Sequence, residues 1–304
     1  ALNDYFSSVF TKNNGIAPPF SSLDDIDPLD NISVSEEGVL SLVLNIDTKK
    51  SPGTDAIPNE FLVRYAEWCS KYLTLIFSKS LSSGEVQSEW KYAKIIPISK
   101  SENKSLVSSY RPISLLCTCA KLLEHIVFKH ISAFLDRNNI IDPRQHSFRK
   151  ALPTTTQLLE TVHDLASALD SHSQIGIIFL DFDKAFDRVS HHKLLIKLKP
   201  ILKNDSLLTW IWAYLSHRYQ SVSVDGSSST PTSVQSGIPQ GSILGPLLFL
   251  VFINDIVCDI PVKISLFADD CILYHVIDNP NDQITLNKSL DKIHSSFFDL
   301  ADEH

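Results

Sequence analysis

Apolar residues recur at the 3.6-residue spacing of an amphipathic helix in several stretches of the chain. Residues 58–81 show this spacing, and residues 121–137 place an apolar face along one helix. Further helices are expected near residues 3–6, after residue 190 and over residues 282–298. Residues 243–253 form the most apolar run, which is too short to cross a bilayer and therefore predicts a buried helix.

Other apolar runs have the length of β-strands. One begins near residue 175 and ends at Asp181, and because it is continuous it predicts a strand buried on both faces. Two more runs flank Asp269 and Asp270, which predicts a hairpin that holds both carboxylates at its turn. Shorter strands are expected at residues 93–98, 222–224 and 234–236.

The predicted elements after about residue 170 follow the order strand, helices, β pair, helix, hairpin and helix. This order is typical of an α+β fold, in which a sheet and helices pack in layers. The preceding part is mostly helical with one small pair of strands. Residues 18–30 are rich in proline and aspartate, which predicts a loop or linker.

Three aspartates lie where the predicted strands end. If the strand ending at Asp181 pairs with the hairpin, its carboxylate converges with those of Asp269 and Asp270. Neighbouring anions repel each other, so a fold keeps them together when a cation lies between them. An oxygen-only donor set favours Mg²⁺ or Mn²⁺, and two such ions about 4 Å apart serve in-line phosphoryl transfer. The alternatives are an acidic β-turn for the hairpin and a helix cap for Asp181.

Ordered motifs along the chain resemble those of the reverse transcriptases of non-LTR (LINE-type) retrotransposons. Residues 181–187 are similar to the family's first palm motif, and residues 267–270 to its catalytic hairpin. Residues 236–246 are similar to its template-and-nucleotide-contacting loop. The motifs that match the family's fingers are residues 50–55, 109–116 and 121–124.

The resemblance implies an α+β fragment of the right-hand polymerase fold, with mostly helical fingers and a palm of antiparallel sheet and packed helices. It divides the chain into an N-terminal extension with an acidic linker (residues 1–50), fingers (51–170) and palm (171–304). The chain contains no methionine, which indicates an internal piece of a longer polypeptide. The thumb and endonuclease domains are expected to lie outside it.

The resemblance also implies roles for individual residues. Asp181, Asp269 and Asp270 would be catalytic and would bind two Mg²⁺ ions, with Mn²⁺ as a substitute. The residues expected to bind the nucleotide are Lys100, Arg111, Phe182, Lys184, Ala185, Phe186, Gln240 and Gly241. Arg111 offers a fork of donors suited to phosphate oxygens. The backbone N–H groups of residues 182–185 would bind the triphosphate at a strand-to-helix turn. The alternative for Arg111 and Lys100 is an exposed surface charge.

Phe186 occupies what resembles the family's sugar gate. A flat aromatic ring there would collide with a ribose 2′-OH, the group that separates ribonucleotides from deoxyribonucleotides, and would therefore favour dNTPs. Plain core packing is the alternative. At Gly241 the backbone can approach a ligand closely, and the Gln240 amide can donate to a base or sugar. Without the resemblance this cluster predicts only a loop.

Composition, with 43% hydrophobic and 20% charged residues, is ordinary for a soluble globular protein. The net charge is −8, but residues 51–150 carry 14 basic and 9 acidic side chains, so phosphate contacts are expected there unless this is simply a solvated surface. The sequence has no signal peptide and predicts no membrane contact, so a nuclear or cytoplasmic location is expected. The five cysteines are expected to be reduced core thiols, and His191 a solvated helix start.

The expected function is RNA-directed DNA synthesis from dNTPs on a DNA primer and an RNA template, with the isolated chain weakly active or inactive. One alternative is an RNA-synthesising polymerase of the same palm type. Another is a catalytically silent relic that binds RNA or protein. Ser147 stands where the family usually has glycine, which predicts altered fingers geometry.

Overall fold

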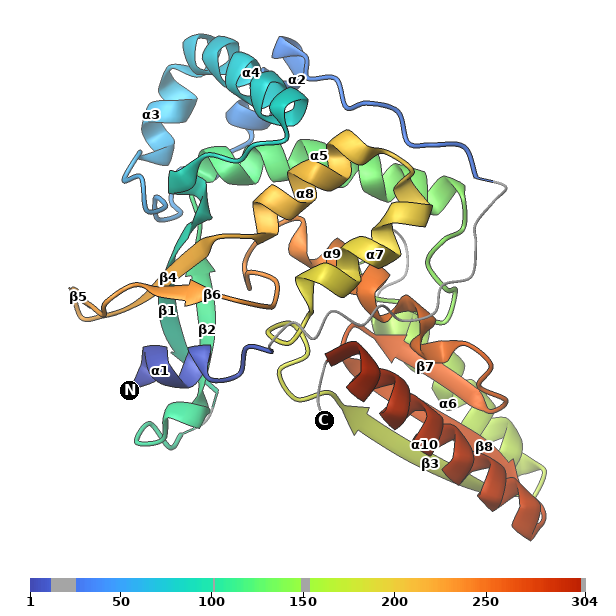
Figure 1. Cartoon of the computed structure of the whole chain (residues 1–304). Coiled ribbons are helices and arrows are strands. Elements are labelled where there is room, and N and C mark those ends of the chain that lie inside the picture. The colour runs from blue at the N-terminus through green and yellow to red at the C-terminus, as the bar shows by residue number, and fades with distance from the viewer. Residues whose placement is uncertain (12–25, 101, 149–153, 302–304) are drawn as a thin grey trace.

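Two β-sheets and a layer of helices make up the structure, a computed structural model that describes residues 1–11, 26–100, 102–148 and 154–301 (Figure 1). The first sheet contains β1 (Tyr92–Ser99), β2 (Tyr110–Leu115), β4 (Arg218–Val224), β5 (Ser227–Ser228) and β6 (Thr232–Val234). The second sheet contains β3 (Gln174–Asp181), β7 (Lys263–Phe267) and β8 (Asp270–Ile277). This mixture of helices and sheets confirms the α+β class.

The first sheet joins segments that are far apart in the sequence. Its strand order is β2-β1-β4-β5, and β6 also pairs with β4. β1 and β2 are antiparallel, whereas β1 and β4 are parallel. The parallel pairing was not predicted, because it depends on a small core shared by Ile95, Val222 and Phe6 of α1 (Leu2–Ser7). The sheet therefore ties the N-terminal helix to the middle of the chain.

The second sheet is antiparallel throughout, in the order β3-β8-β7. Figure 1 shows α10 (Pro280–Ala301) across one side of this sheet and α6 (Thr154–Asp170) on the other. α10 packs closely on β3, since a Cβ added to Gly176 would lie 2.7 Å from the Leu286 side chain. The predicted hairpin and the helix after it are both confirmed.

The expectation that β3 is buried on both faces is wrong. β3 lies at the edge of its sheet, and the side chain of Phe179 is 73% exposed. A continuous apolar run predicts burial only where elements cover both faces, and the face of β3 that carries Phe179 is exposed in the described structure. Ile177 on the same strand is also exposed.

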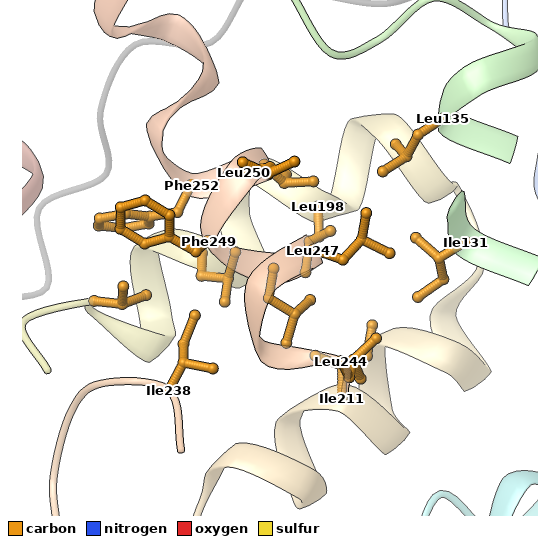
Figure 2. Packing of buried hydrophobic residues seen from close by; sticks show 14 of the residues in the cluster. Ile131, Leu135, Leu198, Ile211, Ile238, Leu244, Leu247, Phe249, Leu250 and Phe252 are labelled. Carbon is orange, nitrogen blue, oxygen red and sulfur yellow. The ribbon is translucent and has the colours of Figure 1, made fainter. Parts of the chain in front are cut away.

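The main hydrophobic core forms around a buried helix, α9 (Gly245–Ile253). Figure 2 shows Ile131, Leu198 and Ile211 beside residues of α9. Each fully buried aliphatic side chain of this kind contributes about 1.5–3 kcal/mol. The other helices of this layer are α2 (Glu36–Leu44), α3 (Asn59–Arg64), α4 (Ala66–Ser83), α5 (Thr118–Arg137), α7 (His191–Leu202) and α8 (Asp205–Leu215).

Both ends of α9 are bound by buried charged side chains. Glu124 of α5 accepts hydrogen bonds at Oε2 from the N–H groups of Ile243 (2.7 Å) and Leu244 (3.1 Å). Lys197 of α7 donates from Nζ to the Phe252 carbonyl at 2.6 Å. A carboxylate at the beginning and an ammonium at the end of a helix both match its dipole. These contacts fix α9, and the loop before it, relative to α5 and α7.

Most helix predictions are confirmed, with two differences. Residues 58–81 form two helices separated at Tyr65, and α7 begins at His191 as expected. However, His191 is only 8% exposed, and its Nε2 lies 2.7 Å from the Gly237 carbonyl, which makes Nε2 the donor. The prediction of a solvated side chain was therefore wrong. The predicted loop at residues 18–30 is described only from residue 26, where it has no regular structure.

None of the described helices combines the length and the apolar character that crossing a bilayer requires. Cys69, Cys117, Cys119 and Cys271 are free, buried thiols, as predicted. Cys258 is free but exposed, so its assignment to the core was wrong.

Candidate active site

The three aspartates lie at one rim of the second sheet. Asp181 ends β3 and is the register partner of Asp270, the first residue of β8. Directly opposed residues of an antiparallel pair have Cα atoms about 4.5–5.5 Å apart. Asp269 lies in the turn before Asp270, next to Ala268, which has a left-handed φ of 56°. The strand that ends at Asp181 therefore pairs with the hairpin, as predicted.

A cleft of about 440 Å³ opens beside this rim. Its lining includes Asp181 and Asp269 together with every residue expected to bind the nucleotide: Lys100, Arg111, Phe182, Lys184, Ala185, Phe186, Gln240 and Gly241. Asp270 belongs to the same rim but is not among the residues that line the cleft. Residues from five separate segments of the sequence thus meet at one site.

The donor set at the rim fits Mg²⁺ but is not a complete protein cage. Burial raises the pKa of Asp269, and the charges of Asp270 and Asp181 raise it further, while Arg111 lowers it. Within the described residues, no three His, Cys, Asp or Glu side chains form a group that could hold a metal ion by themselves. Mg²⁺ is usually bound through one or two carboxylates, with water and substrate phosphates supplying the remaining oxygens. Two carboxylates facing an open cleft match that pattern.

Cationic side chains approach the cleft from the first sheet. Arg111 of β2 is paired with Ile98 of β1, and Lys100 follows the end of β1. Both side chains are exposed. The positive charge of Arg111 lowers the pKa of Asp269, and the positive charge of Lys100 lowers the pKa of Asp187. Cationic and acidic side chains therefore line the same cleft.

The segment after Asp181 is a turn between a strand and a helix, as expected. Residues 183–188 form turns, and α7 begins at His191. Lys184 has a φ of 52°, and the Ala185 N–H donates to the Phe182 carbonyl at 3.2 Å. The backbone therefore folds back on itself at residues 182–185, several residues before the helix starts.

Two aromatic stacks hold this segment in place. The side chain of Phe182 is buried against Phe297 of α10, with ring centroids 4.2 Å apart, so only its backbone is suited to meet a ligand. Phe186 stacks on the buried ring of Phe249 of α9, also at 4.2 Å. The Phe186 ring is therefore both fixed by the core and present in the cleft wall.

The loop at residues 236–241 is bound to two neighbouring segments. Gly237 donates to the Val189 carbonyl at 2.8 Å, and a Cβ added to it would lie 2.6 Å from the Asp187 carbonyl oxygen. Gly241 has a φ of 106°, and its Cβ would lie 2.9 Å from the carbonyl oxygen of Ser114 in β2. Glycine is required at both positions by close approach and by positive φ.

A family model described as "Reverse transcriptase (RNA-dependent DNA polymerase)" matches residues 98–303. The chain belongs to the reverse transcriptase family. It is 34% identical over 247 residues to "RNA-directed DNA polymerase from mobile element jockey" of Drosophila melanogaster, covering 78% of this chain and 27% of the relative.

Two further relatives extend this comparison. "Probable RNA-directed DNA polymerase from transposon BS" of Drosophila melanogaster is 32% identical over 232 residues (76% of this chain, 25% of the relative). The "Retrovirus-related Pol polyprotein from type-1 retrotransposable element R2" of Popillia japonica is 22% identical over 237 residues (73% and 32%). This reverse transcriptase is therefore of the non-LTR (LINE-type) kind. It spans about a quarter of the length of the jockey and BS relatives.

The sequence analysis missed Asp187 as a site residue of this reverse transcriptase. The Gln240 amide donates from Nε2 to both Asp187 oxygens, at 3.0 and 3.2 Å, so this amide nitrogen already has a partner within the protein. Burial raises the pKa of Asp187 to about 6, against the lowering effects of Gln240, Lys184 and Lys100. Asp187 lies within the motif at residues 181–187, but its burial depends on a loop far along the chain.

The N-terminal helix α1 also contributes to the cleft, which was not predicted. Tyr5 and Phe6 line it, and the Lys184 ammonium lies 4.2 Å from the centroid of the Tyr5 ring. Asn3 anchors α1 by donating to Thr232 Oγ1 at 2.8 Å. Nothing in the local sequence indicates this contact, because it needs the whole first sheet to be assembled.

We expect Asp187→Asn to raise the free energy of unfolding more at pH 7.5 than at pH 4.5. A carboxyl whose pKa is raised on folding contributes fully to the stability of the protein at pH values below its unfolded pKa near 3.8. This contribution to stability is lost as the pH rises through its folded pKa of about 6. Asparagine keeps an oxygen for Gln240 and carries no charge. Urea unfolding at both pH values measures the difference. The exposed Asp291→Asn of α10 is the control, and a pH-independent effect of Asp187→Asn would contradict the assignment.

Proposed function

We propose that this reverse transcriptase performs RNA-directed DNA synthesis, transferring a nucleotide from a dNTP to the 3′-OH of a primer on an RNA template. The observation that supports it most is a single cleft that is lined by both carboxylates and cationic side chains. Asp181 and Asp269 belong to the first group, and Lys100 and Arg111 to the second. This is the arrangement that a metal-bound triphosphate requires.

Asp181 and Asp269 would hold two Mg²⁺ ions, with Asp270 beside them and Mn²⁺ as a substitute. When bound, the ions would neutralise charge on the triphosphate and stabilise the attacking and leaving oxygens. Arg111 would bind phosphate oxygens through its planar fork, and Lys100 would add a second positive charge. Lys184 would bring a third cation, held in place by the Tyr5 ring.

The other side of the cleft would select the sugar. Phe186 is fixed by its stack on Phe249, so its ring would stay in the path of a ribose 2′-OH. Gln240 would meet the nucleotide mainly through its oxygen and backbone, because its amide nitrogen is bonded to Asp187. Gly241 would let the backbone come close to the ligand.

The architecture also supports an assignment of subdomains. The second sheet, with the other elements after residue 171, would form the palm, and the helices α3 to α6 with β1 and β2 the fingers. The basic region at residues 51–150 would contact the phosphates of template and primer. Because the chain spans about a quarter of its curated relatives, the thumb and endonuclease domains would belong to the longer polypeptide.

We expect Phe186→Val to raise the use of rNTPs relative to dNTPs by about tenfold, the scale on which removing a steric contact changes selectivity. Extension of a primed RNA template with either nucleotide set measures this, using the chain and a longer polypeptide that contains it. Phe179→Val, on the exposed edge of β3, is the matched control.

The same assay separates the rival functions. A wild-type preference for rNTPs would favour an RNA-synthesising polymerase of this type. A wild-type chain that neither extends the primer nor binds Mn²⁺ would favour a silent relic that binds RNA or protein.

A further inference from the structure

We propose that Gln145 and Ser147 are positioning residues that hold the hairpin turn carrying Asp269. The inference rests on the proposed polymerase function and adds two side chains that do not line the cleft. They act on the backbone of Ala268, immediately before Asp269.

The segment that carries these residues runs along β7 as an additional short strand. Leu266 donates its N–H to the Arg144 carbonyl at 2.9 Å, and His146 donates to the Leu266 carbonyl at 3.0 Å. Gln145 and Leu266 form a parallel β-bridge. The segment is therefore in register with the hairpin and ends beside its turn.

At the turn, two side-chain oxygens converge on one backbone N–H. Ala268 N lies 2.8 Å from Ser147 Oγ and 3.0 Å from Gln145 Oε1. Ser147 donates to Gln145 Oε1 from both its hydroxyl (2.8 Å) and its backbone N–H (3.1 Å). The Gln145 amide lies 3.5 Å from the Ala268 carbonyl. Because all three residues are buried, water does not replace these bonds when one is lost.

The turn needs this support because of its conformation. Ala268 has a φ of 56°, a left-handed geometry that a residue with a Cβ adopts when its surroundings impose it. Its hydrogen bonds to Gln145 and Ser147 are such a constraint. The next residue, Asp269, then presents its carboxylate to the cleft at a defined place. A displacement of about 1 Å at a reacting centre costs on the order of 10²-fold in rate.

The test compares Ser147→Ala and Gln145→Leu with Ser265→Ala. Ser265 is a buried serine of β7 whose hydroxyl has no hydrogen-bond partner among the described residues, so its loss controls for removal of a buried hydroxyl from the same hairpin. The first readout is hydrogen exchange of the Ala268 amide in this chain, which does not depend on activity. We expect exchange to be at least about tenfold faster in the first two variants, by loss of a buried hydrogen bond, and unchanged in Ser265→Ala.

The second readout is the concentration of Mg²⁺ needed for half-maximal extension, together with Mn²⁺ affinity. We expect both to weaken about 10- to 100-fold in Ser147→Ala and Gln145→Leu, the range for residues that orient metal ligands. The KM for primer and template should stay unchanged, which a general loss of structure would not allow.

Each result decides a separate point. Unchanged exchange at Ala268 in Ser147→Ala and Gln145→Leu would overturn the contact itself. Faster exchange with unaltered metal dependence would overturn its role in positioning Asp269. Absence of synthesis by a longer polypeptide that contains the wild-type chain would count against the proposed function, while Mn²⁺ affinity of the chain itself would still test the positioning role.

Discussion

In a longer polypeptide that contains this chain, Asp181→Asn is expected to abolish DNA synthesis, by on the order of 10³-fold or more, and to leave the fold intact. The substitution keeps the shape of the side chain but removes the charge that would bind a divalent ion. Losses of this size follow removal of a group that stabilises charge in the transition state. Asp181 is exposed at the end of β3, so its neutralisation breaks no buried contact. Primer extension on an RNA template measures the rate, and circular dichroism the fold.

The matched control is Asp291→Asn, an exposed aspartate of α10 that does not line the cleft. It makes the same change in net charge and should leave synthesis unaltered. Mn²⁺ titration adds a reading that is independent of turnover, and Asp181→Asn should weaken binding while Asp291→Asn should not. If Asp181→Asn synthesises DNA at the wild-type rate, Asp181 has no part in the mechanism.

The acidic rim could be predicted from the sequence because its parts are local. An apolar run that stops at Asp181 predicts where a strand ends, and the two runs around Asp269 and Asp270 predict a hairpin. The pairing of these strands then follows from the need to bury their apolar faces. The observed register of Asp181 and Asp270 agrees with that inference.

Other features could not be predicted because they depend on contacts between distant segments. The pKa of Asp187 is set by burial under the loop that carries Gln240. The contact of Tyr5 with Lys184 requires the first sheet to bring α1 to the cleft. Likewise, the exposure of Phe179 depends on which helices cover β3, and an apolar run in the sequence carries no information about this.

Ser147 makes a contact that its departure from the family pattern does not indicate. Its replacement of the usual glycine predicts a change in the fingers geometry, and this stays a prediction. In the structure its hydroxyl accepts a hydrogen bond from Ala268 of the hairpin. A glycine at this position has no side-chain oxygen, so the N–H of Ala268 would have Gln145 as its remaining acceptor.

The helix α9 links this chemistry to the core. It follows the loop of Gln240 and Gly241, and its Phe249 supports the ring of Phe186. Whatever fixes the beginning of α9 therefore also fixes two walls of the cleft. Glu124 fixes the beginning of α9, because its carboxylate accepts hydrogen bonds from the N–H groups of Ile243 and Leu244, immediately before the helix.

We therefore expect Glu124→Leu to lower the free energy of unfolding by about 3 kcal/mol, because two buried N–H groups lose their acceptor and each costs about 1–3 kcal/mol. Glu124→Gln is the matched variant, since it has a similar volume and keeps an oxygen that can accept both bonds. Burial raises the pKa of Glu124, so glutamine also removes a cost of ionisation. Urea unfolding at pH 7.5 should place Glu124→Gln near the wild type. Equal losses in both variants would mean that the side chain acts by packing and that the start of α9 is held by its apolar contacts alone.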